Sequence, residues 1–245
     1  MAVRKNNKVS IVVPTYNERD NVFPLFERIT QALAAKWNFE VIFVDDSSPD
    51  GTASVLSQLL TTDDRVKVIV RPAKSGLGSA VRDGFMHASG NYWAMMDADL
   101  SHKPEYLPHL LSALDQADIA IGSRYVPGGG VENWPFLRQM ASRIASGSGR
   151  LLVGLKVRDL TTGFAVFRRE TLEPVLPELS PKGFKIVMEI IAKSPGARLV
   201  ELPILFVDRQ MGKSKFNMRE VFTFLKVCLE LRKLRNRTWD SSTAG

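Results

Sequence analysis

The sequence predicts an α/β fold in which a mostly parallel sheet is flanked by helices. Four short runs rich in β-branched and aromatic residues lie at 9–13, 39–44, 66–70 and 92–96. Runs this apolar are typical of parallel strands that helices bury on both faces. The segments between them, 21–35, 52–60 and 78–88, place apolar side chains at helical intervals. This alternation predicts a doubly wound sheet.

The second half of the chain continues with less regular elements. Its pattern predicts helices at 107–114, 136–152 and 186–192, strands at 119–121, 162–167 and 199–207, and a flexible glycine-rich loop from Pro127. An amphipathic helix at 217–235 and a polar, disordered tail at 236–245 follow. We therefore expect one domain over residues 1–216, followed by this helix and tail.

The amphipathic helix has two interpretations that the sequence leaves open. It can pack on the domain, or it can lie in the headgroup region of a membrane with its basic face toward water. No apolar run approaches the roughly 18 residues that span a bilayer, and the polar N-terminus lacks the apolar core of a secretory signal. These features predict a cytoplasmic protein whose membrane contact is peripheral.

Composition narrows the class of partner. The 245 residues include 33 Lys and Arg against 26 Asp and Glu, which gives a net charge of +7 and favours anionic partners such as nucleotide sugars and lipid phosphates. The sequence shows neither zinc-ligand spacing nor an RNA-binding signature, so no nucleic-acid partner is expected. The lone Cys228 excludes an intrachain disulfide and is expected to pack in the core.

Two carboxylates, Asp97 and Asp99, follow the fourth apolar run. Ligands of doubly wound sheets bind beyond the carboxyl ends of the strands. A hard divalent cation prefers oxygen ligands, and a turn of this kind leaves coordination positions open for a diphosphate. A solvated turn is the alternative, because Asp-x-Asp alone is common.

The first two strand-end loops have residues suited to a nucleoside. Pro14 sets a turn, Tyr16 offers a stacking surface, and the Glu18 carboxylate can accept hydrogen bonds from ribose hydroxyls. Asp46, just past the second run, can accept hydrogen bonds from the N–H groups of a base and so discriminate between bases.

Three other features are expected to be structural. Asp50-Gly51-Thr52 is typical of a turn and a helix start. Gly76-Leu77-Gly78 fits neither G-x-G-x-x-G nor a P-loop, and we interpret it as a tight helix entry. His102, beside Lys103-Pro104, is expected to be a loop residue rather than a metal ligand.

Taken in order, these motifs resemble a known family. They are Pro-x-Tyr-Asn-Glu at 14–18, Val-Asp-Asp-x-Ser-Pro-Asp-Gly-Thr at 44–52, Gly-Leu-Gly at 76–78, Asp-Ala-Asp-Leu-Ser-His at 97–102 and Gly-Ser-Arg-Tyr at 122–125. Gly-Gly-Val-x-Asn-Trp at 129–134, Val-Asp-Arg at 207–209 and Gly-Lys-Ser-Lys at 212–215 continue the match. The chain resembles family 2 glycosyltransferases with the GT-A fold, and among them the dolichol-phosphate and polyprenol-phosphate mannose synthases.

The resemblance implies an activity, ligands and a location. The expected reaction is inverting transfer of mannose from GDP-mannose to a dolichyl or polyprenyl phosphate, with Mg²⁺ or Mn²⁺ as cofactor. The expected location is the cytosolic face of a membrane, and a small membrane anchor subunit is a candidate partner.

The resemblance also implies roles for residues. GDP-mannose is assigned to Pro14, Tyr16, Glu18, Val44, Asp46, Asp97, Ala98, Asp99, Arg209 and Lys215. The metal is assigned to Asp99 and Ser101, the acceptor phosphate to Arg124, Arg138 and Ser142, and catalysis to Asp97, Asp99 and Arg124.

The chemistry of the implied acceptor explains why arginines are expected. A lipid monophosphate has a second pKa of about 6, so at neutral pH it is already a nucleophilic dianion. It needs cations to place it rather than a general base. Planar guanidinium groups suit phosphate. The alternatives are the same reaction with a UDP sugar, and a non-catalytic module that binds a nucleotide sugar or a lipid phosphate.

Overall fold

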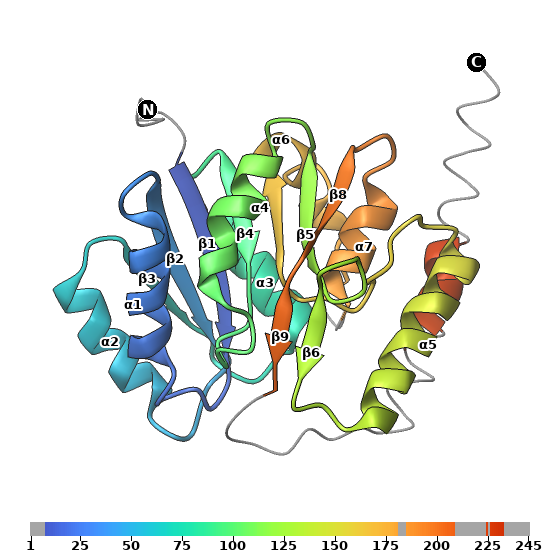
Figure 1. The fold of residues 1–245 in the computed structure, drawn as a ribbon. Helices are drawn as coiled ribbons and strands as arrows, with labels where there is room; N and C mark the ends of the chain where they lie inside the picture. Colours follow the sequence, from blue (N-terminus) through green and yellow to red (C-terminus); the bar gives the residue numbers. More distant parts are fainter. Residues whose placement is uncertain (1–7, 181–184, 209–223, 225, 233–245) are drawn as a thin grey trace.

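The computed structural model describes residues 8–180, 185–208, 224 and 226–232. These residues are built around a central sheet (Figure 1). Within these residues the sheet has seven strands in the order β3-β2-β1-β4-β7-β5-β8, and β6 and β9 form a separate pair. The strands are β1 Lys8–Thr15, β2 Asn38–Asp45, β3 Val66–Val70, β4 Tyr92–Met95, β5 Ile119–Ser123, β6 Gly130–Glu132, β7 Ala165–Arg168, β8 Leu199–Pro203 and β9 Leu205–Val207.

The sheet is mostly parallel, which confirms the predicted fold class. β1 pairs in parallel with β2 and β4, β2 with β3, and β5 with β8. β7 is the exception: it runs antiparallel between β4 and β5, so that Phe167 lies opposite both Trp93 and Ile119. The apolar pattern located this strand but had no bearing on its direction.

Helices cover both faces of the sheet (Figure 1). They are α1 Val22–Leu33, α2 Thr52–Thr62, α3 Leu77–Met86, α4 Leu107–Ala113, α5 Phe136–Val153, α6 Arg169–Leu172 and α7 Ile186–Lys193, with 3-10 turns η1 Pro104–Tyr106 and η2 Leu176–Glu178. α1, α2 and α4 pack on one face with Ile11, whereas α3 and α7 pack on the other with Val12. This division follows from the strand period, because successive side chains point to opposite faces.

Two predicted helix entries are confirmed. The Asp50 carboxylate accepts the Thr52 N–H at 3.0 Å where α2 begins, and Gly51 has a φ of +91°. Gly76, with a φ of +98°, directly precedes α3. Both glycines adopt backbone conformations that are costly for other residues.

The region from residue 199 to 207 differs from the single predicted strand. β8 pairs with β5 as far as Pro203, and the chain then leaves the sheet as β9, which pairs in parallel with β6. Proline has no backbone N–H to continue a ladder. The loop that was predicted to be flexible from Pro127 continues at Gly130 into the strand β6. β6 pairs with β9.

The C-terminal helix is described only at residues 224 and 226–232. There Phe224, Cys228 and Leu231 are buried in the core that covers α3 and α7, so this part packs on the domain. Burial raises the pKa of the Cys228 thiol to about 11, as expected for a packing residue. The rest of the predicted helix at 217–235 and the tail at 236–245 lie outside the described residues. Among the helices described, none combines the length and apolarity that crossing a bilayer demands.

Candidate functional site

Strained backbone marks the loops of one edge of the molecule. In the described part of the chain, four non-glycine residues have positive φ: Asn17 (61°), Ser47 (57°), Leu100 (62°) and Asn133 (62°). They lie in the loops that follow β1, β2, β4 and β6. This conformation costs a non-glycine residue roughly 1–2 kcal/mol, and such strain persists where the surroundings over-determine it, often at functional sites.

The predicted carboxylate pair lies in the most enclosed of these loops. Asp99 is buried, and its Oδ1 accepts hydrogen bonds from the Ser101 N–H at 3.1 Å and the Ser101 hydroxyl at 2.5 Å. Asp97 is partly exposed, with a third of its side chain open to solvent. Ser101 therefore fixes one carboxylate, while the other faces solvent. Ala98 between them is buried in the core.

His102 holds the backbone of Asp97 through a hydrogen bond, a role that the sequence did not predict. It lies in a loop, as predicted, but it is buried, with its ring stacked on Phe164 at 5.2 Å between centroids. Burial lowers the pKa of His102, so the ring is neutral. Nδ1 accepts the Asp97 backbone N–H at 3.2 Å, which assigns the proton to Nε2.

Gly163 closes the same turn. A Cβ at this position would lie 3.3 Å from both Asp97 carboxylate oxygens and 3.3 Å from His102 Cε1. The absence of a side chain lets the loop before β7 approach the carboxylate. The pointer in the sequence is Gly163 itself, because a glycine within a predicted strand often marks a close approach of backbone.

The nucleoside residues predicted from the first loop line an open surface. Tyr16 is 38% exposed, and Lys74 Nζ lies 3.3 Å from its ring centroid. Glu18 accepts a hydrogen bond from Asn21 at 2.7 Å. Pro14 lies at the carboxyl end of β1, opposite Val44 of β2. Val44 is fully buried, so only its backbone is available to a ligand.

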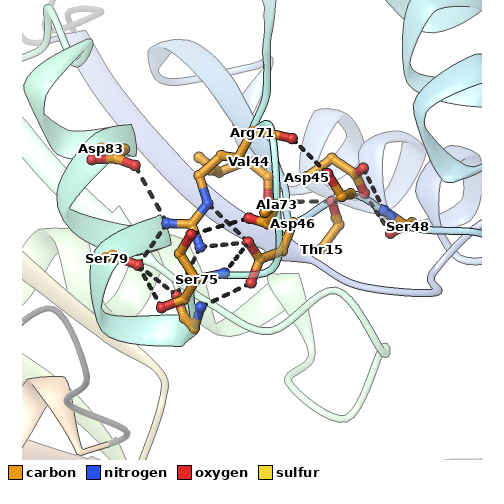
Figure 2. Close-up of polar contacts among 12 residues, drawn as sticks. Thr15, Val44, Asp45, Asp46, Ser48, Arg71, Ala73, Ser75, Ser79 and Asp83 are labelled. Carbon is orange, nitrogen blue, oxygen red and sulfur yellow. Dashed lines mark hydrogen bonds and ion pairs between the residues drawn. The ribbon is translucent and has the colours of Figure 1, made fainter.

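Asp46 lies at the centre of a hydrogen-bond network rather than in the open (Figure 2). Its Oδ1 accepts from Arg71 Nη2 at 2.5 Å and from the Ser75 N–H at 2.9 Å, and its Oδ2 accepts from the Gly76 N–H at 3.0 Å. Burial opposes the charge, but these bonds to the two backbone N–H groups and to Arg71 outweigh it and lower the pKa of Asp46.

Arg71 is the second member of this network, and sequence reasoning missed it. It is buried, donates to the Ser79 hydroxyl at 2.6 Å, and lies 3.3 Å from Asp83. Together Arg71 and Asp46 fold residues 71–76 against the end of β2. The predicted role of Asp46 in binding a base stays a prediction, and its geometry shows that Arg71 sets its position.

Arg124 forms a buried ion pair with Asp159. The guanidinium meets the carboxylate through two bonds of 2.7 Å, Nε to Oδ2 and Nη2 to Oδ1. Burial disfavours the charged guanidinium, but the bonds to Asp159 outweigh it and raise the pKa of Arg124. Asp159 was not predicted. A buried carboxylate of this kind is required once an arginine is buried, since an unpaired charge there is very costly.

The other two predicted acceptor residues lie on α5, beside this pair. Arg124 Nη2 also donates to the Thr161 hydroxyl at 2.6 Å, and that hydroxyl lies 3.2 Å from Ser142 Oγ. Arg138 pairs with Asp208 at 2.7 Å. Thr161 therefore links Arg124 to Ser142.

Trp134 joins the two arginines. Arg138 and Arg124 lie over its ring, at 4.1 Å and 5.2 Å from the centroid. Its Nε1–H is buried and has no hydrogen-bond partner among the described residues, so this donor is open to a water or a ligand. The structure thus places two of the three predicted acceptor residues, Arg124 and Arg138, against Trp134, and Thr161 links the third, Ser142, to Arg124.

Aromatic contacts connect the carboxylates to the arginines. Phe206 of β9 lies 5.2 Å from His102 and 5.3 Å from Trp134, centroid to centroid. The segment that leaves the sheet at Pro203 thereby closes the gap between the two halves of the site. Arg209 and Lys215, which follow it, lie outside the described residues.

The acidic residues that the structure describes do not form a closed metal cage. In the ranges that the structure describes, no three His, Cys, Asp or Glu side chains group together in a way that would hold a metal ion. The carboxylates of Asp97 and Asp99 are hard oxygen donors, which suit Mg²⁺ or Mn²⁺ in a site that a substrate phosphate completes.

Comparisons with known proteins agree on the family. Residues 10–176 match the family described as Glycosyl transferase family 2. The chain is 46% identical over 230 residues to a dolichol-phosphate mannosyltransferase of Pyrococcus furiosus, covering 92% of this chain and 64% of the relative. It therefore spans less than two thirds of that protein. It is 42% identical over 229 residues to a polyprenol monophosphomannose synthase of Mycolicibacterium smegmatis, covering 89% and 85% of the two chains.

Solved structures share the fold. Glucosyl-3-phosphoglycerate synthase from Mycobacterium tuberculosis, crystallised with Mn²⁺, UDP and its product, superposes with a TM-score of 0.66 at 14% identity, covering 95% of this chain and 81% of that one. A complex of the same enzyme with Mg²⁺ and UDP gives a TM-score of 0.67 at 15% identity, covering 93% and 81%. These neighbours have the GT-A fold. By its sequence and its fold, the chain belongs to glycosyl transferase family 2.

Proposed function

We propose that this chain transfers mannose from GDP-mannose to a dolichyl or polyprenyl monophosphate, with inversion at the sugar carbon. The observation that carries the proposal is the pairing of two unlike half-sites. Asp97 and Asp99 make up the first, and Arg124 and Arg138 make up the second. Phe206 links the two, because its ring lies 5.2 Å from His102, which accepts the Asp97 N–H, and 5.4 Å from the Arg124 guanidinium. A donor diphosphate needs the first half-site, an acceptor phosphate needs the second, and the names of both relatives combine a lipid phosphate with mannose.

The donor binds at the carboxyl ends of β1, β2 and β4. Tyr16 stacks on the base, Glu18 accepts from the ribose, and Asp46 and the backbone of Val44 lie at the base edge. A guanine ring presents N–H groups that can donate hydrogen bonds to a carboxylate. Arg209 and Lys215 close over the diphosphate in this proposal.

The metal site fits Mg²⁺ or Mn²⁺ held by Asp99, with Asp97 beside it and Ser101 fixing Asp99. When bound, the metal neutralises charge on the leaving diphosphate. The described chain also prepares this site in advance, because His102 and Gly163 fix the backbone and the approach of Asp97. Such preorganisation lowers the cost of reaching the reactive geometry.

The acceptor phosphate binds at Arg138, which lies over the Trp134 ring, with Ser142 and Thr161 linked to Arg124 nearby. An oxygen of the lipid phosphate forms the new bond to the sugar C1 while the bond from C1 to the diphosphate breaks, and GDP leaves. No proton has to be removed, because the phosphate is already a dianion. Arg138 can exchange Asp208 for the phosphate, since both side chains are about one quarter exposed. Asp159 offsets the charge of Arg124 and fixes its position, so in this proposal Arg124 acts mainly by orienting Thr161.

The lipid acceptor implies work at a membrane. We place the chain at the cytosolic face, where nucleotide sugars are available, and a small membrane anchor subunit is the proposed partner. The described part of the C-terminal helix packs on the core, so any interfacial role of that helix falls to its remaining residues.

The test is transfer of radiolabelled sugar to a short polyprenyl phosphate from GDP-mannose, UDP-glucose or UDP-N-acetylglucosamine, with Mg²⁺ or Mn²⁺ or with chelator. Product from GDP-mannose that requires metal supports the proposal. Transfer only from a UDP sugar would replace the donor and keep the mechanism. Nucleotide binding without transfer from any donor would favour a binding module.

A matched pair of variants tests the carboxylate. Asp99→Asn is expected to lower turnover roughly hundredfold or more, because it removes charge at the leaving group. Asp64→Asn, at an exposed aspartate beyond α2, should leave turnover unchanged. Equal turnover in both variants would refute the assignment of the metal to Asp99.

A further inference from the structure

The outward face of α5 carries large apolar side chains that the fold leaves open to solvent. Phe136 is 72% exposed, Ile144 is 61% exposed and Leu151 is 84% exposed, and Met140 is 42% exposed between the first two. Their spacing of four, four and seven residues places them within one stripe of a helix. A surface helix of a globular domain normally turns polar residues outward, so this stripe needs another explanation.

The exposed stripe and the buried face of α5 consist of different residues. Ser146, Gly149 and Val153 make up the buried face of α5. A Cβ on Gly149 would lie 3.1 Å from the Phe224 ring, which shows how closely that face packs. In Figure 1, α5 stands at the flank of the molecule, and the helical residues 226–232 lie behind it. The helix therefore has a buried face of small residues and Val153, and a separate apolar face that the described residues leave exposed.

Arginines line the edge of the exposed stripe. A cleft of about 460 Å³ is lined by Tyr125, Arg143, Gly147, Arg150 and Arg158. A second cleft of about 690 Å³ shares Gly147, Arg150 and Arg158 and also includes Leu151 and Lys156. Among the ion pairs of the described residues, none involves the side chains of Arg143, Arg150 or Arg158, although most other arginines here have an acidic partner.

Apolar side chains and uncompensated arginines on one surface fit a lipid bilayer with anionic headgroups. The apolar stripe can enter the boundary between headgroups and acyl chains, and the arginines can bind the phosphates beside it. A soluble phosphate would use the arginines alone and leave the stripe exposed. We propose that the outward face of α5 docks this chain on an anionic membrane, with the stripe Phe136, Met140, Ile144 and Leu151 inserted and the clefts at Arg143, Arg150 and Arg158 holding lipid phosphates.

The geometry of α5 connects docking to the proposed reaction. Arg138 and Ser142, assigned to the acceptor phosphate, are on the same helix and contact the site through Asp208 and Thr161. Docking through the outward face therefore brings the acceptor half-site to the bilayer surface. This link rests on the proposed function, whereas the docking surface itself rests only on the exposed stripe and the arginines.

The experiment measures co-sedimentation of the full chain with vesicles of phosphatidylcholine, alone or mixed with phosphatidylglycerol. Ile144→Gln/Leu151→Gln is expected to weaken binding to the anionic vesicles roughly tenfold or more. Arg150→Gln/Arg158→Gln is expected to weaken it by roughly fivefold for each arginine removed. The control is Leu60→Gln/Met86→Gln, which removes similarly exposed apolar side chains from α2 and α3 and should bind as the parent does. Because all these side chains are exposed, thermal unfolding should be unchanged and will confirm that each variant is folded.

Several outcomes would overturn the docking surface. Failure of the parent to bind anionic vesicles would do so, as would parental binding by both α5 variants. Displacement by inorganic phosphate, at a concentration where sodium chloride of equal ionic strength has no effect, would indicate a soluble-anion site. A dimer that the stripe variant dissolves would indicate a protein interface.

Transfer assays separate this inference from the proposed function. With a short, water-soluble polyprenyl phosphate, the stripe variant should retain parental turnover, but with a long acceptor embedded in vesicles it should lose activity in step with binding. Vesicle binding without transfer to either acceptor would refute the proposed function and leave the docking surface standing.

Discussion

Glu40 lies at the end of the sheet opposite the site, so replacing it tests the fold without touching the chemistry. It is 2% exposed. Its carboxylate accepts hydrogen bonds from Lys8 at 2.7 Å, from the Ser10 hydroxyl at 2.6 Å and from the Ser89 N–H at 2.7 Å, and Lys67 lies 3.0 Å away. The cluster ties β1, β2 and β3 to the turn before β4. We expect Glu40→Gln to destabilise the protein substantially at neutral pH.

The magnitude follows from the pKa of this carboxyl. Burial opposes the charge, but the bonds from Lys8, Ser10 and Ser89 outweigh it and lower the pKa from 4.5 to about 2. A shift of this size corresponds to about 3 kcal/mol of unfolding free energy at neutral pH. Because the pKa is lower in the folded state, this contribution is complete above pH 4.5 and is lost as the pH falls toward 2. By pH 3, about 2 kcal/mol of it should be gone.

Urea unfolding of the parent and of Glu40→Gln, measured from neutral pH down to pH 3, is the appropriate assay. The difference in unfolding free energy should be about 3 kcal/mol at neutral pH and should shrink as the pH falls. Glu27→Gln, at an exposed position on α1, should change little at any pH. A difference between parent and Glu40→Gln that is small, or that stays constant with pH, would refute the reasoning.

Three further predictions concern the site. Gly163→Ala should lower kcat roughly tenfold in the transfer assay with little change in KM for the lipid, because its Cβ would press on Asp97 and displace it; an unchanged kcat would show that the contact has no catalytic weight. Arg71→Met should destabilise the fold by roughly 3 kcal/mol and weaken GDP binding in calorimetry, because it leaves Asp46 charged and buried. Adding Asp46→Asn should restore stability but not GDP affinity. Full recovery of both quantities would exclude Asp46 from base binding. His102→Asn should retain more turnover than His102→Leu, because the amide oxygen can accept the Asp97 N–H in place of Nδ1; equal losses would contradict that role.

The fold was predictable because its signals are local. The apolar runs at β1, β2 and β4 are buried on both faces, and the run at β3, on the sheet edge, is partly buried. Such runs are recognisable without tertiary information. The direction of β7 was not predictable, because Ala165–Arg168 has no side-chain pattern that distinguishes parallel from antiparallel pairing. Pro203 is a signal for the break between β8 and β9. The partner strand β6 gave no such signal, because it lies in a glycine-rich segment that predicts a loop.

The site divides in the same way. Asp97, Asp99 and Tyr16 follow strands directly, so their placement follows from the sheet. Their supports were missed, because Asp159 reaches Arg124 across 35 positions and Arg71 reaches Asp46 across 25. Partners so far apart meet only through the tertiary fold. Buried charges need such partners, so each predicted charge implied a partner that the sequence alone does not identify.

The antiparallel strand β7 also governs how the chain can be completed during synthesis. β4 and β5 are not neighbours in the sheet, and both depend on β7 for one edge. Until residues 165–168 have left the ribosome, each presents unpaired backbone groups to other chains. Fragments that stop before residue 165 should therefore aggregate, even though they include β1 to β4 and the loops that follow these strands. The sheet formed by the first four strands therefore depends, for its open edge, on a segment that is made only after α5.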